Sequence, residues 1–325
     1  MPEIGTSMAE SLTEERRSAR RLARLTRAGL FGTNTHGAII EQASTFHDLQ
    51  QAYRLVHDVY VESGYIRPDT SGIRLRMFEA SPDEATFVAK IEGRVVGVVS
   101  VAADSVALGL PSDTCFKEVL DELRAQGARL SEMTNQAVAA EYRKSGIATE
   151  LMRCAAAHVI RGQFDENVAV ISPNHAAFYK ILGFREIGTP RSYSDTVYDP
   201  VVALSTGLDQ YRKPVPDPGD ETRCFVQNFM ADGNPFMAQV EQWARAAAAH
   251  FRDSQLLRQL FISETAFITQ CSKEDLAFLK RIWGRRLFNS VTGRSLFTRA
   301  KAWSSAFLDI CKVMEDDCPF ARGFR

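Results

Sequence analysis

Apolar spacing switches repeatedly between strand type and helix type from about residue 36 to residue 205, and this constrains the fold more than any other feature. Residues 85–91 and 94–103 are β-rich runs separated by Glu92-Gly93, which is a hairpin signal. Further along, a strand, a helix and a strand follow one another, which predicts a β-α-β crossover. We therefore expect a mixed α/β (α+β) unit. Its expected strands are 36–44, 85–91, 94–103, 130–138, 167–172, 184–187 and 199–205, and its expected helices are 46–60, 116–125, 146–161 and 174–182.

The chain of 325 residues is about twice the usual length of one domain, so more than one structural unit is expected. Residues 214–220 hold three prolines and a glycine, which is typical of a linker. After it β-rich alternation disappears, and helical spacing recurs at 236–251, 256–268, 274–287 and 296–313. We predict a polar, Arg-rich N-terminal extension at 1–35, an α/β domain at 36–213, a linker at 214–220 and an all-helical region at 221–325.

The N-terminal extension carries six arginines between Arg16 and Arg27, with leucines among them. One interpretation is a solvated leader. The other is an amphipathic helix that rests on a partner or makes peripheral contact with an anionic membrane. The sequence leaves both open.

Composition excludes several classes of protein. Lysine and arginine (39) balance aspartate and glutamate (40), so no overall basic field would attract nucleic acid. Six cysteines without a C-x-x-C pair favour free thiols in a reducing cytoplasm over a zinc or disulfide framework, and we expect no metal site. The apolar stretches fall short of the roughly 20 residues that span a bilayer, so no transmembrane segment is expected.

The segment between the expected strand 130–138 and the expected helix 146–161 carries the pattern R-x-x-G-x-A, formed by Arg143, Gly146 and Ala148. Small residues at a helix N-terminus let an anion approach backbone N–H groups, so this loop is a candidate phosphate site. An ordinary strand-to-helix turn is the alternative.

About 25 residues later, N-x-x-A-x-Y-x-x-x-G-F runs from Asn174 to Phe184. Together the two motifs resemble the acyl-CoA N-acyltransferase (GNAT) fold. The resemblance implies that two parallel central strands splay apart around the pantetheine arm of the acyl donor. It places Tyr179 near the thioester, where a phenol can protonate the leaving thiolate; packing beneath the last strand is its alternative role. The implied donor-binding residues are Arg143, Lys144, Ser145, Gly146, Ile147, Ala148 and Asn174.

A second resemblance lies upstream, in A-Y-R-L-V-H-D-V-Y-V-E-S-G-Y from Ala52 to Tyr65. This segment is similar to the opening helix of the FeeM-type long-chain N-acyl amino acid synthases and the related N-acyl homoserine lactone synthases. The likeness runs from about Ala52 to Leu204. It implies a bacterial, cytoplasmic lipid-forming N-acyltransferase that moves a long-chain acyl group from an acyl carrier protein to the α-amino group of an amino acid. It implies no permanently bound cofactor, with acyl-phosphopantetheine, on carrier protein or coenzyme A, as the donor.

The strand at 130–138 departs from the family pattern. Glu132 is retained, but Asn135 stands where the resembling enzymes have arginine, and Asp83-Glu84 lie in a different register from the acidic pattern of the lactone synthases. A lactone synthase is therefore less favoured. Glu132 is the candidate general base, because apolar neighbours would raise its pKa; a solvated or salt-bridged role is the alternative.

An amino-acid acceptor also needs a cation for its carboxylate. Arg67, Arg74 and Arg76 lie in the segment that closes over the acceptor in the resembling enzymes, and they are the candidate acceptor-binding residues. His175, at the start of the expected helix 174–182, is a secondary catalytic candidate.

Two other functions remain open. One is a coenzyme A-dependent N-acetyltransferase, and the other is a non-catalytic GNAT-fold module that recruits a partner through its helical region. That region holds eight basic and two acidic residues between Lys273 and Lys301, so it could instead dock an acidic acyl carrier protein.

Overall fold

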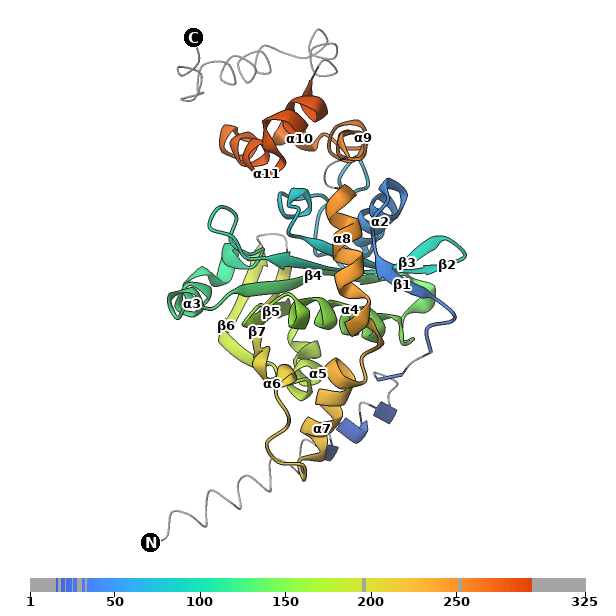
Figure 1. Cartoon of the computed structure of the whole chain (residues 1–325), viewed down its shortest axis with the longest axis vertical. Helices are drawn as coiled ribbons and strands as arrows, with labels where there is room; N and C mark the ends of the chain where they lie inside the picture. The colour runs from blue at the N-terminus through green and yellow to red at the C-terminus, as the bar shows by residue number, and fades with distance from the viewer. Residues whose placement is uncertain are drawn as a thin grey trace.

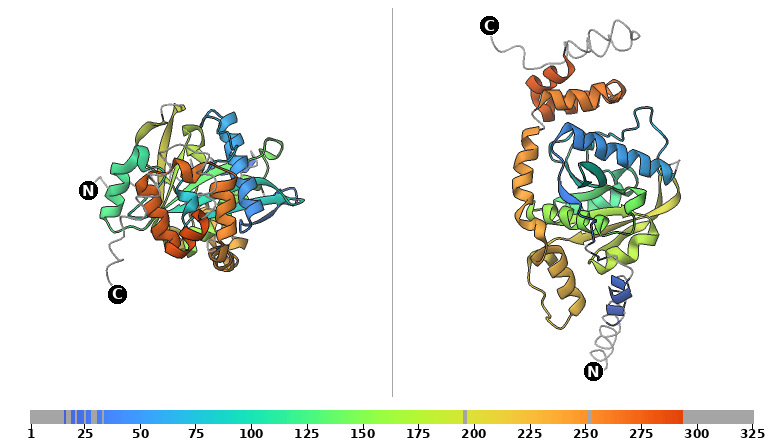
Figure 2. Two further views of the ribbon diagram at one scale, coloured as in Figure 1. Left: turned by 90° about the horizontal axis from the view of Figure 1, so that it is seen from above. Right: turned by 90° about the vertical axis from the view of Figure 1, so that its right-hand side faces the viewer.

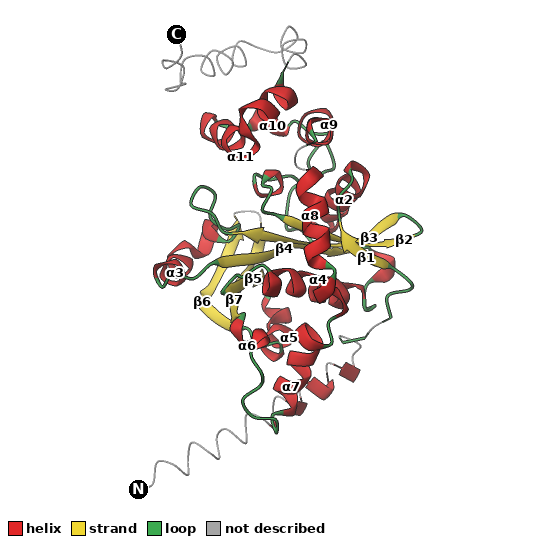
Figure 3. Cartoon of the chain, viewed as in Figure 1, coloured by secondary structure: helices red, strands yellow, loops and turns green. Residues whose placement is uncertain are grey.

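The computed structural model describes residues 34–194, 197–250 and 253–293, together with 16, 19, 20, 22–24, 26, 27, 31 and 32. Its centre is a seven-stranded sheet with the order β1-β2-β3-β4-β5-β7-β6, lying between two layers of helices (Figures 1 and 3). The strands are β1 (Ile39–Gln42), β2 (Ala85–Ile91), β3 (Arg94–Ala103), β4 (Leu130–Val138), β5 (Glu166–Ile171), β6 (Arg185–Ser194) and β7 (Val197–Gly207).

Only β4 and β5 pair in parallel among the described strands, and α4 (Ile147–Arg161) connects them. The predicted hairpin and the predicted crossover are therefore both confirmed. The mixed sheet with flanking helices is the GNAT-like α/β arrangement that the sequence predicted. The other helices of this part are α2 (Phe46–Glu62), α3 (Asp113–Ala125), α5 (Ala176–Ile181) and α6 (Asp209–Arg212), with single 3₁₀ turns at Phe78–Ala80, Ala140–Tyr142 and Pro173–His175.

The two faces of the sheet bury different residues of the same strands. On β2, Phe87 packs in the core beneath α4, whereas Val88 packs in the core beneath α2. Close approach of α4 depends on Gly97 of β3, because a Cβ there would lie 2.7 Å from Cγ2 of Ile147. Thr45 caps the N-terminus of α2, and its side chain accepts a hydrogen bond from the Asp48 N–H at 3.1 Å.

The helices after residue 220 pack against both faces of the α/β unit. Phe229 and Val240 join the core beneath α4, whereas Leu257 and Trp283 join the core beneath α2. Figure 2 shows α8 (Val240–His250) running past the sheet and joining the two groups. These helices are α7 (Glu221–Gln227), α8, α9 (Ser254–Arg258), α10 (Phe267–Gln270) and α11 (Lys273–Thr292), with π-helical turns at Asn228–Asp232 and Gln259–Ser263 and a 3₁₀ turn at Pro235–Ala238.

Polar contacts reinforce this packing. The Arg153 guanidinium of α4 donates to the carbonyls of Phe229 at 3.0 Å and Gly233 at 2.7 Å. The Trp283 indole donates to the Ala80 carbonyl at 2.9 Å. The helical region therefore shares its cores with the α/β unit, and the predicted domain boundary at 214–220 stays a prediction.

The helical spacing predicted one helix over residues 256–268, but in the structure α9 passes into a π-helical turn that ends at Ser263. The Thr265 hydroxyl then bonds the Leu260 carbonyl at 3.0 Å, and α10 begins after this break. The expected helix at 296–313 lies outside the described residues. Across the ranges that are described, no helix is both long enough and apolar enough to cross a membrane.

Candidate active site

The parallel strands β4 and β5 separate partway along their length. Their register runs from Leu130 opposite Glu166 to Met133 opposite Ala169 and then stops, although β4 continues to Val138. The β3–β4 register also shifts at this point, and Asn135 has a positive φ of 53°. The sheet therefore opens between β4 and β5 where the resemblance to the GNAT fold implies a gap for pantetheine.

Tyr179 of α5 lies beside this opening. Its hydroxyl donates to Oε1 of Gln136 on β4 at 3.3 Å, and its ring packs edge-on to Phe184 with centroids 5.2 Å apart. Burial, and then the charge of Tyr60, raise the pKa of the Tyr179 phenol above its ordinary value. A phenol that stays protonated can donate a proton, so the catalytic and packing interpretations of Tyr179 are compatible.

Glu132 is buried on β4 just before the opening, with 2% of its surface exposed. Its Oε2 accepts hydrogen bonds from the Ser112 N–H at 2.9 Å and the Ser112 hydroxyl at 2.7 Å. Burial raises the pKa of Glu132 to about 7, against the lowering effect of these two bonds. Its other oxygen, Oε1, is bonded to none of the described residues, and a carboxylate with this pKa can accept a proton near neutral pH.

Three cationic candidates for the acceptor carboxylate have different surroundings. Arg67 is exposed. Arg76 is committed to the chain itself, because its Nη2 lies 2.5 Å from Oε1 of Glu79 and 3.3 Å from Oδ1 of Asn135. Arg74 differs from both: its Nε and Nη1 are buried and have no hydrogen-bond partner among the residues described.

The Arg74 guanidinium lies over the Tyr60 ring, 5.2 Å from its centroid. Burial, and then the neighbouring Arg76, lower the pKa of Arg74. Tyr193 of β6 is near enough to feel the charges of Glu132, Arg76 and Arg74, and its hydroxyl donates to the Pro111 carbonyl at 3.3 Å. One face of the sheet thus brings together a buried carboxylate, a phenol and an unpaired cation.

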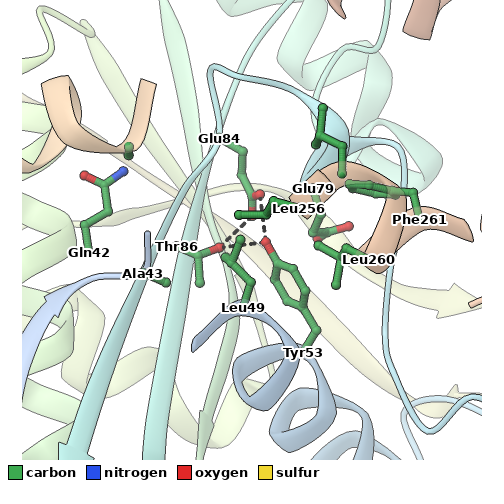
Figure 4. Close-up of a pocket in the computed structure, with 12 residues that line it drawn as sticks. Gln42, Ala43, Leu49, Tyr53, Glu79, Glu84, Thr86, Leu256, Leu260 and Phe261 are labelled. Carbon is green, nitrogen blue, oxygen red and sulfur yellow. Dashed lines mark hydrogen bonds between the residues drawn. The ribbon is translucent and has the colours of Figure 1, made fainter. Parts of the chain in front are cut away.

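A buried pair of carboxylates, Glu84 and Glu79, also lies on this face, and the sequence analysis did not identify it. The Tyr53 hydroxyl donates to Oε2 of Glu84 at 3.4 Å, and Thr86 bonds the other oxygen at 3.3 Å (Figure 4). Burial, and then the Glu79 carboxylate, raise the pKa of Glu84 to about 8. Glu84 is buried and the neighbouring Asp83 is exposed, but β2 is buried without alternation from Ala85 to Ala89, so its periodicity gave no signal that separated the two.

A cavity of about 20 Å³ lies beside this pair, and Leu256, Leu260 and Phe261 of the helical region close it (Figure 4). That volume suits about one water molecule.

The residues of the predicted donor loop, 143–148, bond to other groups of the chain. Arg143 pairs with Glu62 of α2 at 2.5 Å, and Lys144 has a positive φ of 66°. The Ser145 hydroxyl donates to the Tyr142 carbonyl at 2.6 Å, and the Gly146 N–H donates to the Asn34 carbonyl at 2.8 Å.

The other predicted site residues flank this loop. Ile147 is buried in the core beneath α4 and Ala148 follows it in the first turn of that helix. Asn174 and His175 are exposed at the start of α5. The assigned roles of all these residues stay predictions. Across the described ranges, no group of three or more histidine, cysteine, aspartate or glutamate side chains is arranged to hold a metal ion.

Residues 51–207 match the family described as N-acyl amino acid synthase FeeM. A search of curated proteins finds no match.

Several solved structures are similar to parts of the chain. FeeM from uncultured soil microbes is 24% identical, with 54% of this chain and 93% of that chain covered and a TM-score of 0.48. The coenzyme A-dependent acyl-homoserine lactone synthase BjaI is 16% identical, with 65% and 99% covered and a TM-score of 0.43. A GNAT-family acetyltransferase from Streptococcus pneumoniae is 16% identical, with 52% and 98% covered and a TM-score of 0.39.

The family match spans just under half of the chain and lies within the α/β part, where the sequence resemblance placed it. The helices beyond residue 207 lie outside it. Over residues 51–207, this chain is similar to the FeeM N-acyl amino acid synthase family, and the match indicates an acyltransferase.

Proposed function

We propose that this protein transfers a long-chain acyl group from the phosphopantetheine thioester of an acyl carrier protein to the α-amino group of an amino acid. The family match supports acyl transfer to nitrogen. The observation that carries the amino-acid acceptor is Arg74, whose buried guanidinium has two nitrogens without a partner among the described residues. A buried cation with unmet donors is matched by a carboxylate, which can accept a charge-assisted hydrogen bond from it.

In this proposal the acceptor lies on the face that carries Arg74 and Glu132. Glu132 takes a proton from the amine as the nitrogen attacks the thioester carbon, and its pKa of about 7 suits that task at neutral pH. The new C–N bond forms, the C–S bond breaks, and the leaving thiolate takes a proton from Tyr179. The pantetheine arm enters through the opening between β4 and β5.

The remaining predicted residues keep subsidiary roles. Asn174 and the loop from Arg143 to Ala148 hold the donor phosphate. Arg76 orders the acceptor face by binding Glu79 and Asn135. Exposed Arg67 attracts the acceptor, and His175 stays a secondary proton carrier.

The donor and acceptor are tested by supplying purified protein with an acyl carrier protein or coenzyme A carrying a long-chain or an acetyl group, plus a mixture of amino acids. Mass spectrometry should show N-acyl amino acids formed fastest from the long-chain carrier protein. Faster product formation from acetyl-coenzyme A would replace the proposal with an N-acetyltransferase.

The carboxylate contact is tested with Arg74→Gln. Charged hydrogen bonds contribute about 1.5–3 kcal/mol, so KM for the amino acid should rise about 10–100-fold. KM for the corresponding amino-acid amide should stay as in the wild type, because the amide lacks the carboxylate. Arg67→Gln is the matched control and should change KM for the amino acid less than threefold, as expected of an exposed charge. Equal KM values for Arg74→Gln and wild type would refute this contact.

A further inference from the structure

The N-terminal segment formed by Phe31, Gly32 and Asn34 lies against the loop to which the proposed function assigns the donor phosphate. The Asn34 carbonyl accepts the Gly146 N–H at 2.8 Å. A phosphate oxygen bound by that N–H would have to occupy the same place, because N–H···O bonds join heavy atoms about 2.9 Å apart. The contact and a phosphate at Gly146 therefore exclude one another.

The approach of the two backbones is close enough to require glycine. A Cβ on Gly146 would lie 2.4 Å from the Gly32 carbonyl oxygen and 3.0 Å from the Asn34 nitrogen. Glycine at this position thus serves the N-terminal segment as well as any donor. A bulky residue at 146 would disturb both, so it cannot test donor binding alone.

Phe31 anchors the segment next to the loop. Its ring lies 5.4 Å from that of Phe178 and 5.2 Å from those of Phe225 and Phe229, centroid to centroid, and 9% of its surface is exposed. Phe178 precedes Tyr179 at the strand opening, and the other two rings belong to the helical region. The anchor therefore joins the N-terminal segment, the donor end and the helical region in one aromatic cluster.

Three other N–H groups of the loop also have partners in the chain. The Arg143 N–H donates to the Ala140 carbonyl, the Ser145 N–H to the Tyr142 carbonyl and the Ile147 N–H to the Ser145 hydroxyl, each at 3.3 Å. These three bonds are local to the loop, whereas the bond from Gly146 goes to a segment more than a hundred residues away. Gly146 is therefore the point at which a distant segment bonds the loop.

From this geometry we infer that the segment formed by Phe31, Gly32 and Asn34 is an autoinhibitory plug that competes with the donor phosphate for the Gly146 N–H. This inference rests on the proposed function, because it needs the donor to bind this loop. The donor binds only the fraction of molecules in which the plug has left, so its apparent affinity is reduced by that fraction. The amino-acid acceptor does not compete with the plug.

The plug is tested in the full chain with Phe31→Ala, which removes the anchor and touches none of the proposed catalytic groups. KM for the acyl-carrier-protein donor should fall about tenfold, since a weakened anchor raises the open fraction. kcat and KM for the amino acid should stay unchanged. Phe236→Ala is the matched control: Phe236 is equally buried in the same core but its ring packs on Trp243, so its KM for the donor should equal that of the wild type.

A second measurement does not depend on turnover or on the stability of Phe31→Ala. Fluorinated phenylalanine is placed at position 31, and its ¹⁹F resonance is followed while a non-reactive acyl-coenzyme A thioether is added. The resonance should move toward its value in the urea-unfolded protein, and the amino acid alone should not move it.

An unmoved resonance at thioether concentrations that saturate binding in calorimetry would overturn the plug and leave the proposed function intact. An unchanged donor KM in folded Phe31→Ala would do the same. Failure of every donor to bind both wild type and Phe31→Ala would overturn the plug together with the donor assignment.

Discussion

The proposed donor end and the proposed acceptor face of this domain differ in how their polar groups are satisfied. At the donor end the Gly146 N–H is bonded to Asn34, and Arg143 is paired with Glu62. On the acceptor face the Nε and Nη1 of Arg74 find no partner in the described part of the chain, although Arg76 beside it is fully engaged. The polar groups of the donor loop are therefore bonded within the chain, whereas the Arg74 guanidinium has donors that are free to bind a ligand. Donor binding should therefore cost a rearrangement, and acceptor binding should not.

The largest expected effect is on the acceptor face. Glu132→Gln keeps the bonds to Ser112 but removes the base, so kcat should fall by about 10²–10⁴. In the wild type kcat should rise with pH through about 7, the pKa of Glu132, because the carboxylate must be ionised to accept a proton. Steady-state assays of the wild type and the variant from pH 5 to 9 measure the loss of kcat and its dependence on pH. A variant with wild-type kcat and an intact fold would remove Glu132 from the mechanism.

A smaller loss is expected at the donor end. Tyr179→Phe keeps the ring that packs on Phe184 and removes the hydroxyl, so kcat should fall about tenfold, because a thiolate leaves readily without full protonation. Tyr211→Phe is the control, since its buried hydroxyl bonds Thr206 and the Leu182 carbonyl. It should lower the melting temperature but not kcat. If the two variants lose kcat equally, Tyr179 has only a packing role.

The buried acidic pair predicts a pH effect on stability. The pKa of Glu84 is about 8 in the folded protein and 4.5 in its unperturbed state, so its contribution is present below 4.5 and is lost as pH rises through 8. Because Glu79 is coupled to it, the titration belongs to the pair. Glu84→Gln should therefore gain melting temperature relative to wild type between pH 5 and 9. Asp83→Asn changes an exposed neighbour, so its melting temperature should vary with pH in parallel with that of the wild type. The same parallel variation for Glu84→Gln would contradict the raised pKa of Glu84.

The smallest effect is expected on carrier-protein docking. Arg285 and Arg286 of α11 are exposed, and they follow a kink at Gly284, where φ is 76°. Reversing both to Glu should raise KM for the acyl carrier protein about threefold at low salt, leave an acyl-pantetheine donor unaffected and flatten the salt dependence. Arg245→Glu on α8, also exposed, is the control. Identical KM values at low salt would leave these residues as ordinary surface. The basic residues Arg294, Arg299 and Lys301 lie outside the described residues.

Local pattern was a good guide to the elements of the α/β unit. The predicted strands 85–91, 94–103 and 130–138 match β2, β3 and β4 exactly, and the predicted crossover helix is one residue longer than α4. It was a poorer guide beyond residue 220, where α7 was not expected and residues 256–268 do not form one helix. There the helices are short, and their ends depend on side-chain bonds such as that of Thr265.

Local spacing and residue chemistry were enough to predict the strand and helix periodicities, the donor-loop motif and the residue types of the candidate site. Which of those residues are free depends on how the chain folds. Arg74 and Arg76 are two residues apart, yet Arg76 reaches Asn135 across 59 positions while Arg74 does not bond a carboxylate among the described residues. Likewise, Gly146 meets Asn34 only because the chain returns to it. An N–H that donates to one acceptor is no longer free to bind a ligand. When the acceptor is distant in the sequence, the fold decides whether the two groups come within hydrogen-bond distance.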